Sequence, residues 1–250
     1  MKQFDLYIFD LDGVLYRGNE PIPNASKSLN TLRERKKQIR FLTNNSSKTR
    51  EVYMYKLQKL GFDAQEHEIY SSAFGAAKYL QKLETKSVHV LGEDGLRQEL
   101  SDAQMNFHEP PEWVVVGICW KLTYSMLDEA QNHIRNGAKF LATNRDATFP
   151  DEDGKIRPGA GSIIAALATC VNKEPDYVIG KPNPFLIELI LNETQTPKEK
   201  TLLIGDRVDT DIAAARNAGI ASALVLSGVA TKEDQNEADF CFDSAAEIAL

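Results

Sequence analysis

The chain has 250 residues, 42% of them hydrophobic, and its 29 Lys and Arg against 36 Asp and Glu give a formal net charge of −7. This length and composition support a packed core and exclude disorder as the default state. The acidic balance excludes a broad basic surface for nucleic acid or anionic lipid. We therefore expect a small-molecule partner, with no nucleic acid and no membrane.

The cysteines and the apolar runs indicate the compartment. Cys119, Cys170 and Cys241 stand far apart and form no C-x-x-C pair, which does not suit a disulfide framework. No apolar run approaches the roughly 20 residues that span a bilayer. The sequence predicts a cytoplasmic protein without an export signal or a membrane segment.

Short apolar runs alternate with helix-like stretches along the whole chain. This alternation is typical of an α/β fold with a doubly wound, mostly parallel sheet, because strands in such sheets are short and uniformly apolar. The predicted strands are Phe4–Phe9, Ile39–Leu42, Ile69–Ser71, Val88–Leu91, Trp113–Ile118, Phe140–Ala142, Tyr177–Ile179, Thr201–Ile204, Ala223–Leu226 and Phe240–Phe242.

Three helices are predicted between these strands. One covers Lys48–Leu60 and ends at Gly61, another covers Ala73–Leu83, and a third covers Asp211–Ala218 and ends at Gly219. A glycine directly after a helix adopts the left-handed conformation at low cost. The predicted apolar stripe of the first helix consists of Val52, Tyr53, Leu57 and Leu60.

Polar residues follow four of the apolar runs. They are Asp10 and Asp12, Thr43 and Asn44, Lys181, and Asp206. Residues just beyond the carboxyl ends of parallel strands converge although they are distant in sequence. Converging carboxylates repel one another, and Mg²⁺, which prefers oxygen ligands, relieves that repulsion. A hydroxyl and an ammonium suit phosphate oxygens, so the set predicts phosphoryl transfer with Mg²⁺ as the cofactor.

The same residues resemble the four motifs of the haloacid dehalogenase superfamily. The motifs are Asp10-Leu11-Asp12-Gly13-Val14, Thr43-Asn44-Asn45, Lys181-Pro182, and Gly205-Asp206 followed by Asp211. GKPNP at 180–184, GDRVDTDI at 205–212 and LATNRDATFP at 141–150 resemble the NagD-like phosphatase branch, which includes nitrophenyl phosphate phosphatases. The resemblance covers nearly the whole chain.

The resemblance implies a mechanism and a role for each residue. Asp10 is the expected nucleophile, and Asp12 is the expected acid and base. The Asp10 and Asp206 side chains and the backbone carbonyl of Asp12 are expected to hold Mg²⁺. Thr43 and Lys181 are expected to hold the phosphoryl oxygens.

Three further residues have supporting roles in this scheme. Asn44 is expected to contact phosphate or nearby backbone, and Asp211 to lie beside the metal site or reach it through water. Gly13 is expected to permit a close backbone turn.

The stretch between Thr43 and Lys181 far exceeds the roughly 30 residues of a strand–helix–strand unit. We expect a catalytic core at 1–83 and 178–250 and an inserted α/β domain at 84–177. In the resembling branch this insert is a type II cap that selects the substrate and can mediate a homodimer. The expected substrate contacts in it are Asn144, Arg145 and Asp146, together with backbone amides of the turn at Gly159–Ser162.

Two groups of polar residues are predicted to have no functional role. The Asp-Glu-Asp-Gly run at 151–154 is predicted to be a solvated turn. His67, His89, His108 and His133 show no paired metal-ligand spacing and are predicted to be structural or exposed.

The predicted function is that of a Mg²⁺-dependent phosphomonoesterase acting on a small phosphorylated metabolite. Phosphoglycolate, sugar phosphates, nucleoside monophosphates and pyridoxal phosphate all remain open as substrates. A phosphotransferase or phosphomutase that uses the same aspartyl phosphate also remains open, as do a receiver-like signalling domain and a retired enzyme that only binds.

Overall fold

The computed structural model describes residues 4–150 and 155–249, so the turn predicted at 151–154 lies outside the described residues. The chain divides into two compact units. The first contains residues up to 43, 51–70 and those from 181 on, and the second contains 44–50 and 71–180. The predicted domain boundaries at 84 and 177 stay a prediction, and the compact units differ from them mainly in grouping 71–83 with the second unit.

The first unit is built on a six-stranded sheet with the order β14-β13-β12-β1-β4-β5. Its pairs β1–β4, β1–β12, β12–β13 and β13–β14 are parallel, which confirms the predicted α/β class. The strands are β1 (Leu6–Phe9), β4 (Gln38–Thr43), β5 (Ile69–Ser71), β12 (Thr201–Gly205), β13 (Ala221–Val225) and β14 (Phe240–Phe242), and a small hairpin joins β2 (Tyr16–Arg17) and β3 (Glu20–Pro21). The helical elements are α1 (Ala25–Glu34), α2 (Arg50–Lys59), η1 (Glu66–Glu68), α7 (Phe185–Thr194), η2 (Lys198–Lys200), η3 (Val208–Ile212), α8 (Ala213–Ala218), η4 (Lys232–Asp234) and η5 (Ala245–Glu247).

Both faces of this sheet are buried. Tyr7 and Phe9 of β1 pack into a core with Leu29 of α1 and Leu57 of α2, whereas the alternate residues of β1 point to the opposite face and are also buried. Helices α7 and α8 pack together and belong to that opposite side. A strand covered on both faces must be apolar at every position, which is why β1 reads as an unbroken apolar run.

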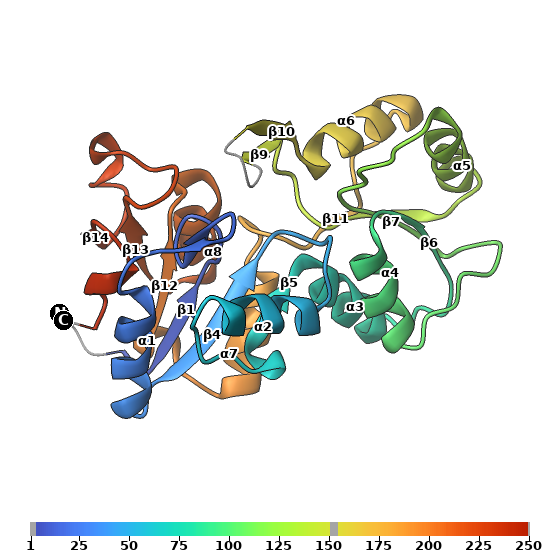
Figure 1. The fold of residues 1–250 in the computed structure, drawn as a ribbon. Helices are drawn as coiled ribbons and strands as arrows, with labels where there is room; N and C mark the ends of the chain where they lie inside the picture. The colour runs from blue at the N-terminus through green and yellow to red at the C-terminus, as the bar shows by residue number, and fades with distance from the viewer. Residues whose placement is uncertain (1–3, 151–154, 250) are drawn as a thin grey trace. The chain divides into compact units, whose positions relative to one another are not determined.

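The chain runs outward from the middle of the sheet in two directions. From β1 it continues to β4 and β5 on one side, and from β12 it continues to β13 and β14 on the other (Figure 1). The reversal between β1 and β12 is a topological switch point, where an open parallel sheet forms a crevice at the carboxyl ends of its strands.

Two of the predicted helices differ in detail from the observed ones. Helix α2 buries Tyr53 and Leu57, but Val52 is 44% exposed, so its place in the apolar stripe was wrong. One residue along a helix is a turn of about 100°, which carries Val52 off the buried face. The helix predicted at Asp211–Ala218 begins earlier, as the π-helical turn η3, and continues as α8.

The second unit has its own four-stranded parallel sheet, in the order β11-β8-β7-β6. Helices α5 and α6 pack over one hydrophobic core with β7 and β8. The strands are β6 (Val88–Leu91), β7 (Trp113–Val116), β8 (Lys139–Ala142) and β11 (Tyr177–Val178), with a separate hairpin of β9 (Thr148–Pro150) and β10 (Ile156–Pro158). The helices are α3 (Ser72–Lys82), α4 (Asp94–Asp102), α5 (Tyr124–Arg135) and α6 (Ala160–Val171).

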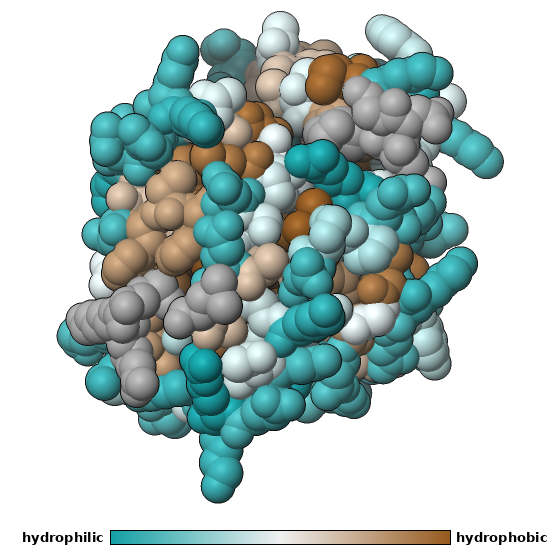
Figure 2. Space-filling model, turned by 60° about the vertical axis from the view of Figure 1, so that its left-hand side comes forward, coloured by the Kyte–Doolittle hydropathy of each residue, from teal (hydrophilic) through white to brown (hydrophobic). Residues whose placement is uncertain are grey.

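Hydrophilic side chains predominate on the face drawn in Figure 2, and hydrophobic residues show between them in small groups. Among the described residues, no helix has the length and apolar character needed to cross a membrane.

Candidate active site

Three of the predicted site residues stand at the carboxyl ends of neighbouring strands. Asp10 directly follows β1, Asp206 directly follows β12, and Thr43 is the last residue of β4. The backbone amide of Asp10 donates to the Ile204 carbonyl at 2.9 Å, which ties the start of its loop to β12. The switch point therefore brings these three residues to one edge of the sheet.

Lys181 reaches the same place by a route that the sequence did not predict. The strand before it, β11, belongs to the sheet of the second unit, and Lys181 lies in the segment that leads into α7. Its buried ammonium donates to Asp10 Oδ1 at 2.7 Å and to Asp211 Oδ1 at 2.5 Å. One lysine thus joins the carboxylates that follow β1 and β12.

Three carboxylates converge at this edge. Asp10, Asp206 and Asp211 each offer an oxygen, and these oxygens all lie within 4.8 Å of one another. The ammonium of Lys181 forms ion pairs with two of these carboxylates, Asp10 and Asp211. The cluster carries more negative than positive charge.

Burial and the neighbouring charges shift the pKa values of these groups. Burial raises the pKa of Asp10 well above its usual value, although the neighbouring Lys181 opposes that shift. Burial and then the charge of Asp211 raise the pKa of Asp206 to about 7. Burial alone would lower the pKa of Lys181, but Asp10 and Asp211 hold it above its usual value, so the ammonium stays charged.

Asp206 is held by a loop that follows β13. The backbone amide of Val229 donates to Asp206 Oδ2 at 2.8 Å. A Cβ on Gly228 would lie 1.9 Å from the same oxygen, and a Cβ on Gly13 would lie 2.3 Å from it. The Ser227 hydroxyl donates to the Gly13 carbonyl at 2.7 Å and joins the two loops. The backbone at Gly13, where a close turn was predicted, therefore packs directly against the Asp206 carboxylate.

The Ser227–Val229 loop was not among the predicted site residues. The available signal was a polar residue and a glycine directly after a fifth apolar run, Ala223–Leu226. Strand β13 neighbours β12 in the sheet, so its following loop lies next to Asp206.

Replacing Gly228 with alanine tests this close packing. We expect Gly228→Ala to lower the free energy of unfolding by about 1 to 3 kcal/mol, because the added methyl overpacks the Asp206 carboxylate. Val229→Ala is the matched control, since its side chain is exposed and its amide keeps the bond to Asp206. Urea unfolding followed by far-UV circular dichroism measures both variants, and equal stabilities would contradict the prediction.

Asp211 is fixed by its own turn. Its Oδ2 accepts from the Arg207 amide at 3.1 Å, and a Cβ on Gly205 would lie 2.2 Å from its Cβ. Its Oδ1 remains directed at Lys181. Asp211, predicted to lie beside the metal site, thus belongs to the carboxylate cluster itself.

Asp12 does not join that cluster. Its side chain is exposed, and Oδ2 accepts from the Tyr16 hydroxyl at 3.4 Å. Burial, followed by the charge of Asp12, raises the pKa of Tyr16 well above its usual value, so this hydroxyl keeps its proton. The expectation that the side chains of Asp10, Asp12 and Asp206 all gather at one point is wrong for Asp12.

The remaining predicted contacts lie in the second unit. Asn44 Nδ2 and Asn144 Nδ2 both donate to Asp146 Oδ2, at 2.8 Å and 2.6 Å. Arg145 forms an ion pair with Glu174. These residues form a local polar network, and their predicted contacts with substrate or phosphate stay predictions.

Three of the four amides in the turn at Gly159–Ser162 form hydrogen bonds inside the protein. The amides of Gly159, Gly161 and Ser162 donate to the carbonyls of Ala147, Asp146 and Gly159. Since these three donors are used inside the protein, the prediction that they face a ligand was wrong, and for the Ala160 amide it stays a prediction.

The carboxylate cluster fits a hard divalent cation. Its donors are all oxygens, they lie close together, and their charge exceeds that of Lys181. Mg²⁺ prefers such ligands, and its charge would offset both the burial and the repulsion by Asp211 that raise the pKa of Asp206.

Comparison with known proteins agrees with this arrangement. Residues 7–106 match the family described as haloacid dehalogenase-like hydrolase, and residues 178–248 match a second family described as HAD-hydrolase-like. The 5'-nucleotidase YutF of Bacillus subtilis is 36% identical over 95% of this chain and 93% of its own length.

Two solved structures extend the likeness to the fold. The 4-nitrophenylphosphatase of Thermotoga maritima has a TM-score of 0.94 at 34% identity, covering 98% of this chain and 96% of its own. NagD of E. coli K-12 has a TM-score of 0.90 at 31% identity, covering 98% of each chain.

Proposed function

The chain belongs to the haloacid dehalogenase-like hydrolases and is a phosphatase of their NagD-like branch, and on this basis we propose that it hydrolyses phosphate monoesters through an aspartyl phosphate on Asp10. The observation that supports this mechanism is the position of the Asp10 carboxylate, which lies beside Lys181 and within 4.8 Å of Asp206 and Asp211. A buried carboxylate beside a lysine ammonium can act as a nucleophile toward phosphorus.

The two steps divide between Asp10 and Asp12. Asp10 attacks phosphorus and the bond to the substrate oxygen breaks, while Asp12 gives its proton to that leaving oxygen. Asp12 then takes a proton from water, which attacks the phosphorus, releases inorganic phosphate and restores Asp10. An exposed carboxylate suits this exchange of protons, and the Tyr16 hydroxyl orients Asp12 through its hydrogen bond.

The charges of the site would stabilise the transferring phosphoryl group. Lys181 and Thr43 are the proposed donors to its oxygens, with Asn44 as a further contact, and Asp211 holds Lys181 in place. Mg²⁺ held by Asp10, Asp206 and the backbone carbonyl of Asp12 would supply positive charge at the phosphoryl oxygens.

The substrate is proposed to be a small phosphorylated metabolite. One relative is named as a 5'-nucleotidase and another as a 4-nitrophenylphosphatase, and both names denote phosphate monoester substrates. We propose that the second unit is the cap domain and that its polar network of Asn144, Arg145 and Asp146 contributes to substrate selection. The cytoplasm is the proposed compartment.

Metal removal tests the proposal directly. We expect hydrolysis of 4-nitrophenyl phosphate with added Mg²⁺, its loss with excess EDTA, and its return when Mg²⁺ is restored, because the carboxylate cluster lacks sufficient positive charge of its own. Phosphate release and transfer to an added alcohol are measured together. Undiminished turnover in EDTA would contradict the metal requirement, and dominant transfer to the alcohol would favour the phosphotransferase alternative.

A further inference from the structure

The second unit contains a cluster of histidine and glutamate side chains that the phosphatase site does not use. His89 lies on β6, and Glu129 and His133 lie one helical turn apart on α5. One ligand atom from each lies within 4.8 Å of the others. The rings of His89 and His133 have their centroids 4.7 Å apart. Residues four apart on a helix project from the same side, so α5 directs both of its side chains toward β6.

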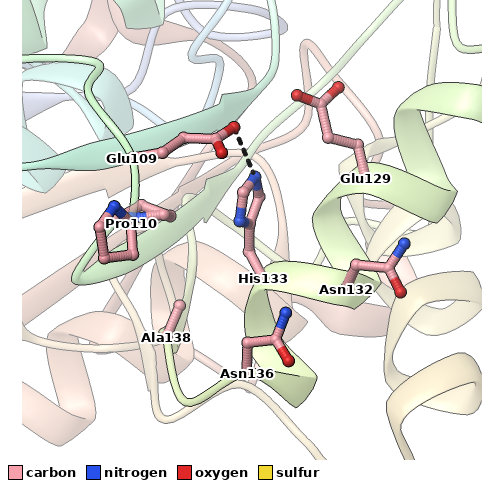
Figure 3. A pocket seen from close by; sticks show the side chains of 8 residues that line it. Glu109, Pro110, Glu129, Asn132, His133, Asn136 and Ala138 are labelled. Carbon is pink, nitrogen blue, oxygen red and sulfur yellow. Dashed lines mark ion pairs between the residues drawn. The ribbon is translucent and has the colours of Figure 1, made fainter.

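A fourth side chain approaches from the loop before β7. Glu109 Oε1 lies 3.5 Å from Nε2 of His133, and Figure 3 shows these two side chains pointing toward each other. Glu129 Oε1 lies 3.8 Å from Nδ1 of His89. Two imidazoles and two carboxylates therefore converge from three different segments.

The distances suit a shared cation better than direct ion pairs. Charge-assisted hydrogen bonds between nitrogen and oxygen measure roughly 2.7 to 2.9 Å, and both pairs are longer. Tetrahedral Zn²⁺ has ligands at roughly 2.0 to 2.2 Å, which places neighbouring ligand atoms about 3.3 to 3.6 Å apart. Side-chain adjustments would bring His89, Glu129 and His133, whose ligand atoms lie within 4.8 Å of one another, to this spacing, and Glu109 could join them from its position beside His133.

The Nε2 atom of His133 faces Glu109 Oε1 at 3.5 Å, and this contact does not satisfy it as a hydrogen bond. It is buried, and it has no hydrogen-bond partner within the described part of the chain. A buried polar atom without a partner is costly, and a metal ion on a neutral imidazole nitrogen satisfies it.

The cluster borders a cavity of about 500 Å³. Glu109, Glu129 and His133 line it together with the amide side chains of Asn132 and Asn136 (Figure 3). The cavity supplies an entry path for an ion to the two histidines, whose side chains are mostly buried.

We propose that His89, His133, Glu129 and Glu109 form a binding site for a divalent transition-metal ion, Zn²⁺ in the first instance. Imidazole with carboxylate is a ligand set that Zn²⁺ accepts and that Mg²⁺, which requires oxygen ligands, does not favour. The site would clamp β6, α5 and the loop at Glu109 together within the second unit. It is chemically distinct from the all-oxygen cluster at Asp10.

Zinc titration of the full chain tests the site. Protein stripped of bound metal is equilibrated with excess Mg²⁺, so that the oxygen cluster is filled. Zn²⁺ binding is then followed by isothermal titration calorimetry. We expect one equivalent to bind to the wild type and the affinity to fall at least about 100-fold in His133→Asn and in His89→Asn, since loss of an outer-shell partner alone costs roughly 10- to 100-fold. His67→Asn is the matched control, because His67 is an exposed histidine of the first unit.

Two additions keep the result decisive. Glu129→Gln alters a side chain that is 54% exposed, so it preserves folding and should still weaken Zn²⁺ binding. Imidazole NMR signals should shift on zinc addition for His89 and His133 and not for His67. Equal zinc affinity in the wild type and both histidine variants would overturn the proposal, as would zinc binding that is lost only in Asp206→Asn.

Discussion

Replacing Asp10 with asparagine is expected to lower kcat/KM for 4-nitrophenyl phosphate by at least about 10⁴-fold, in line with the effect of removing a covalent nucleophile. The amide keeps the shape of the side chain but cannot attack phosphorus as a carboxylate does. It also removes the charge that faces Lys181 at 2.7 Å. Steady-state kinetics at saturating Mg²⁺ measure the loss.

Asp209→Asn is the matched control for this experiment. Asp209 is an exposed aspartate that follows β12 and pairs with Arg207, and it lies outside the carboxylate cluster. It should retain wild-type turnover. In Asp12→Asn, mass spectrometry should detect a phosphorylated chain after mixing with substrate, because hydrolysis of the intermediate lacks its base. Full activity in Asp10→Asn would refute the assignment of the nucleophile.

Replacing Lys181 with methionine is expected to lower the free energy of opening of the first unit by about 3 to 5 kcal/mol in the absence of metal, the cost of breaking a buried ion pair. Methionine has a similar length but leaves Asp10 and Asp211 without the ammonium. Hydrogen exchange of amides in β1 and β12 is the appropriate measurement, because Trp113 and Trp120 both lie in the second unit and do not report on this sheet.

A double-mutant cycle separates the charge effect from lost packing. Asp211→Asn added to Lys181→Met removes one uncompensated charge and should recover part of the loss. Lys37→Met removes an ion pair of similar length with Asp5 at the surface and should leave β1 exchange nearly unchanged. Equal protection in wild type and Lys181→Met would show that the buried pair contributes nothing.

The sheet of the first unit could be predicted because its chemistry is local. Strand β1 is apolar at every position, and β14 and β5 were predicted with their observed bounds. The order of the strands was not predicted and comes from the structure, in which β1 pairs with β12 across nearly the whole chain. Tyr177–Ile179 read like a core strand, but as β11 it pairs with β8 in the other sheet. The apolar pattern of a strand does not indicate which other strand it pairs with.

The candidate site was predictable to the extent that it depends on strand ends. Asp10, Thr43, Asp206 and Lys181 were all predicted from the ends of apolar runs, although the strand before Lys181 belongs to the other sheet. The direct contact of Asp211 with Lys181 depends on the turn at η3. The hydrogen bond from Val229 to Asp206 depends on β13 lying next to β12 in the sheet. His89 and His133 gave no signal because their proximity comes from the packing of α5 on β6.

The order in which the two units are encoded has a consequence for synthesis on the ribosome. Strand β1 emerges early, but its partner β12 is translated only after the whole second unit. At about 5 to 20 residues per second, that interval is on the order of 10 to 40 s. Throughout it, one edge of β1 lacks its permanent neighbour and can pair with another nascent chain. Newly made protein should therefore be most prone to aggregate just before its last fifth, which begins with β12, is translated.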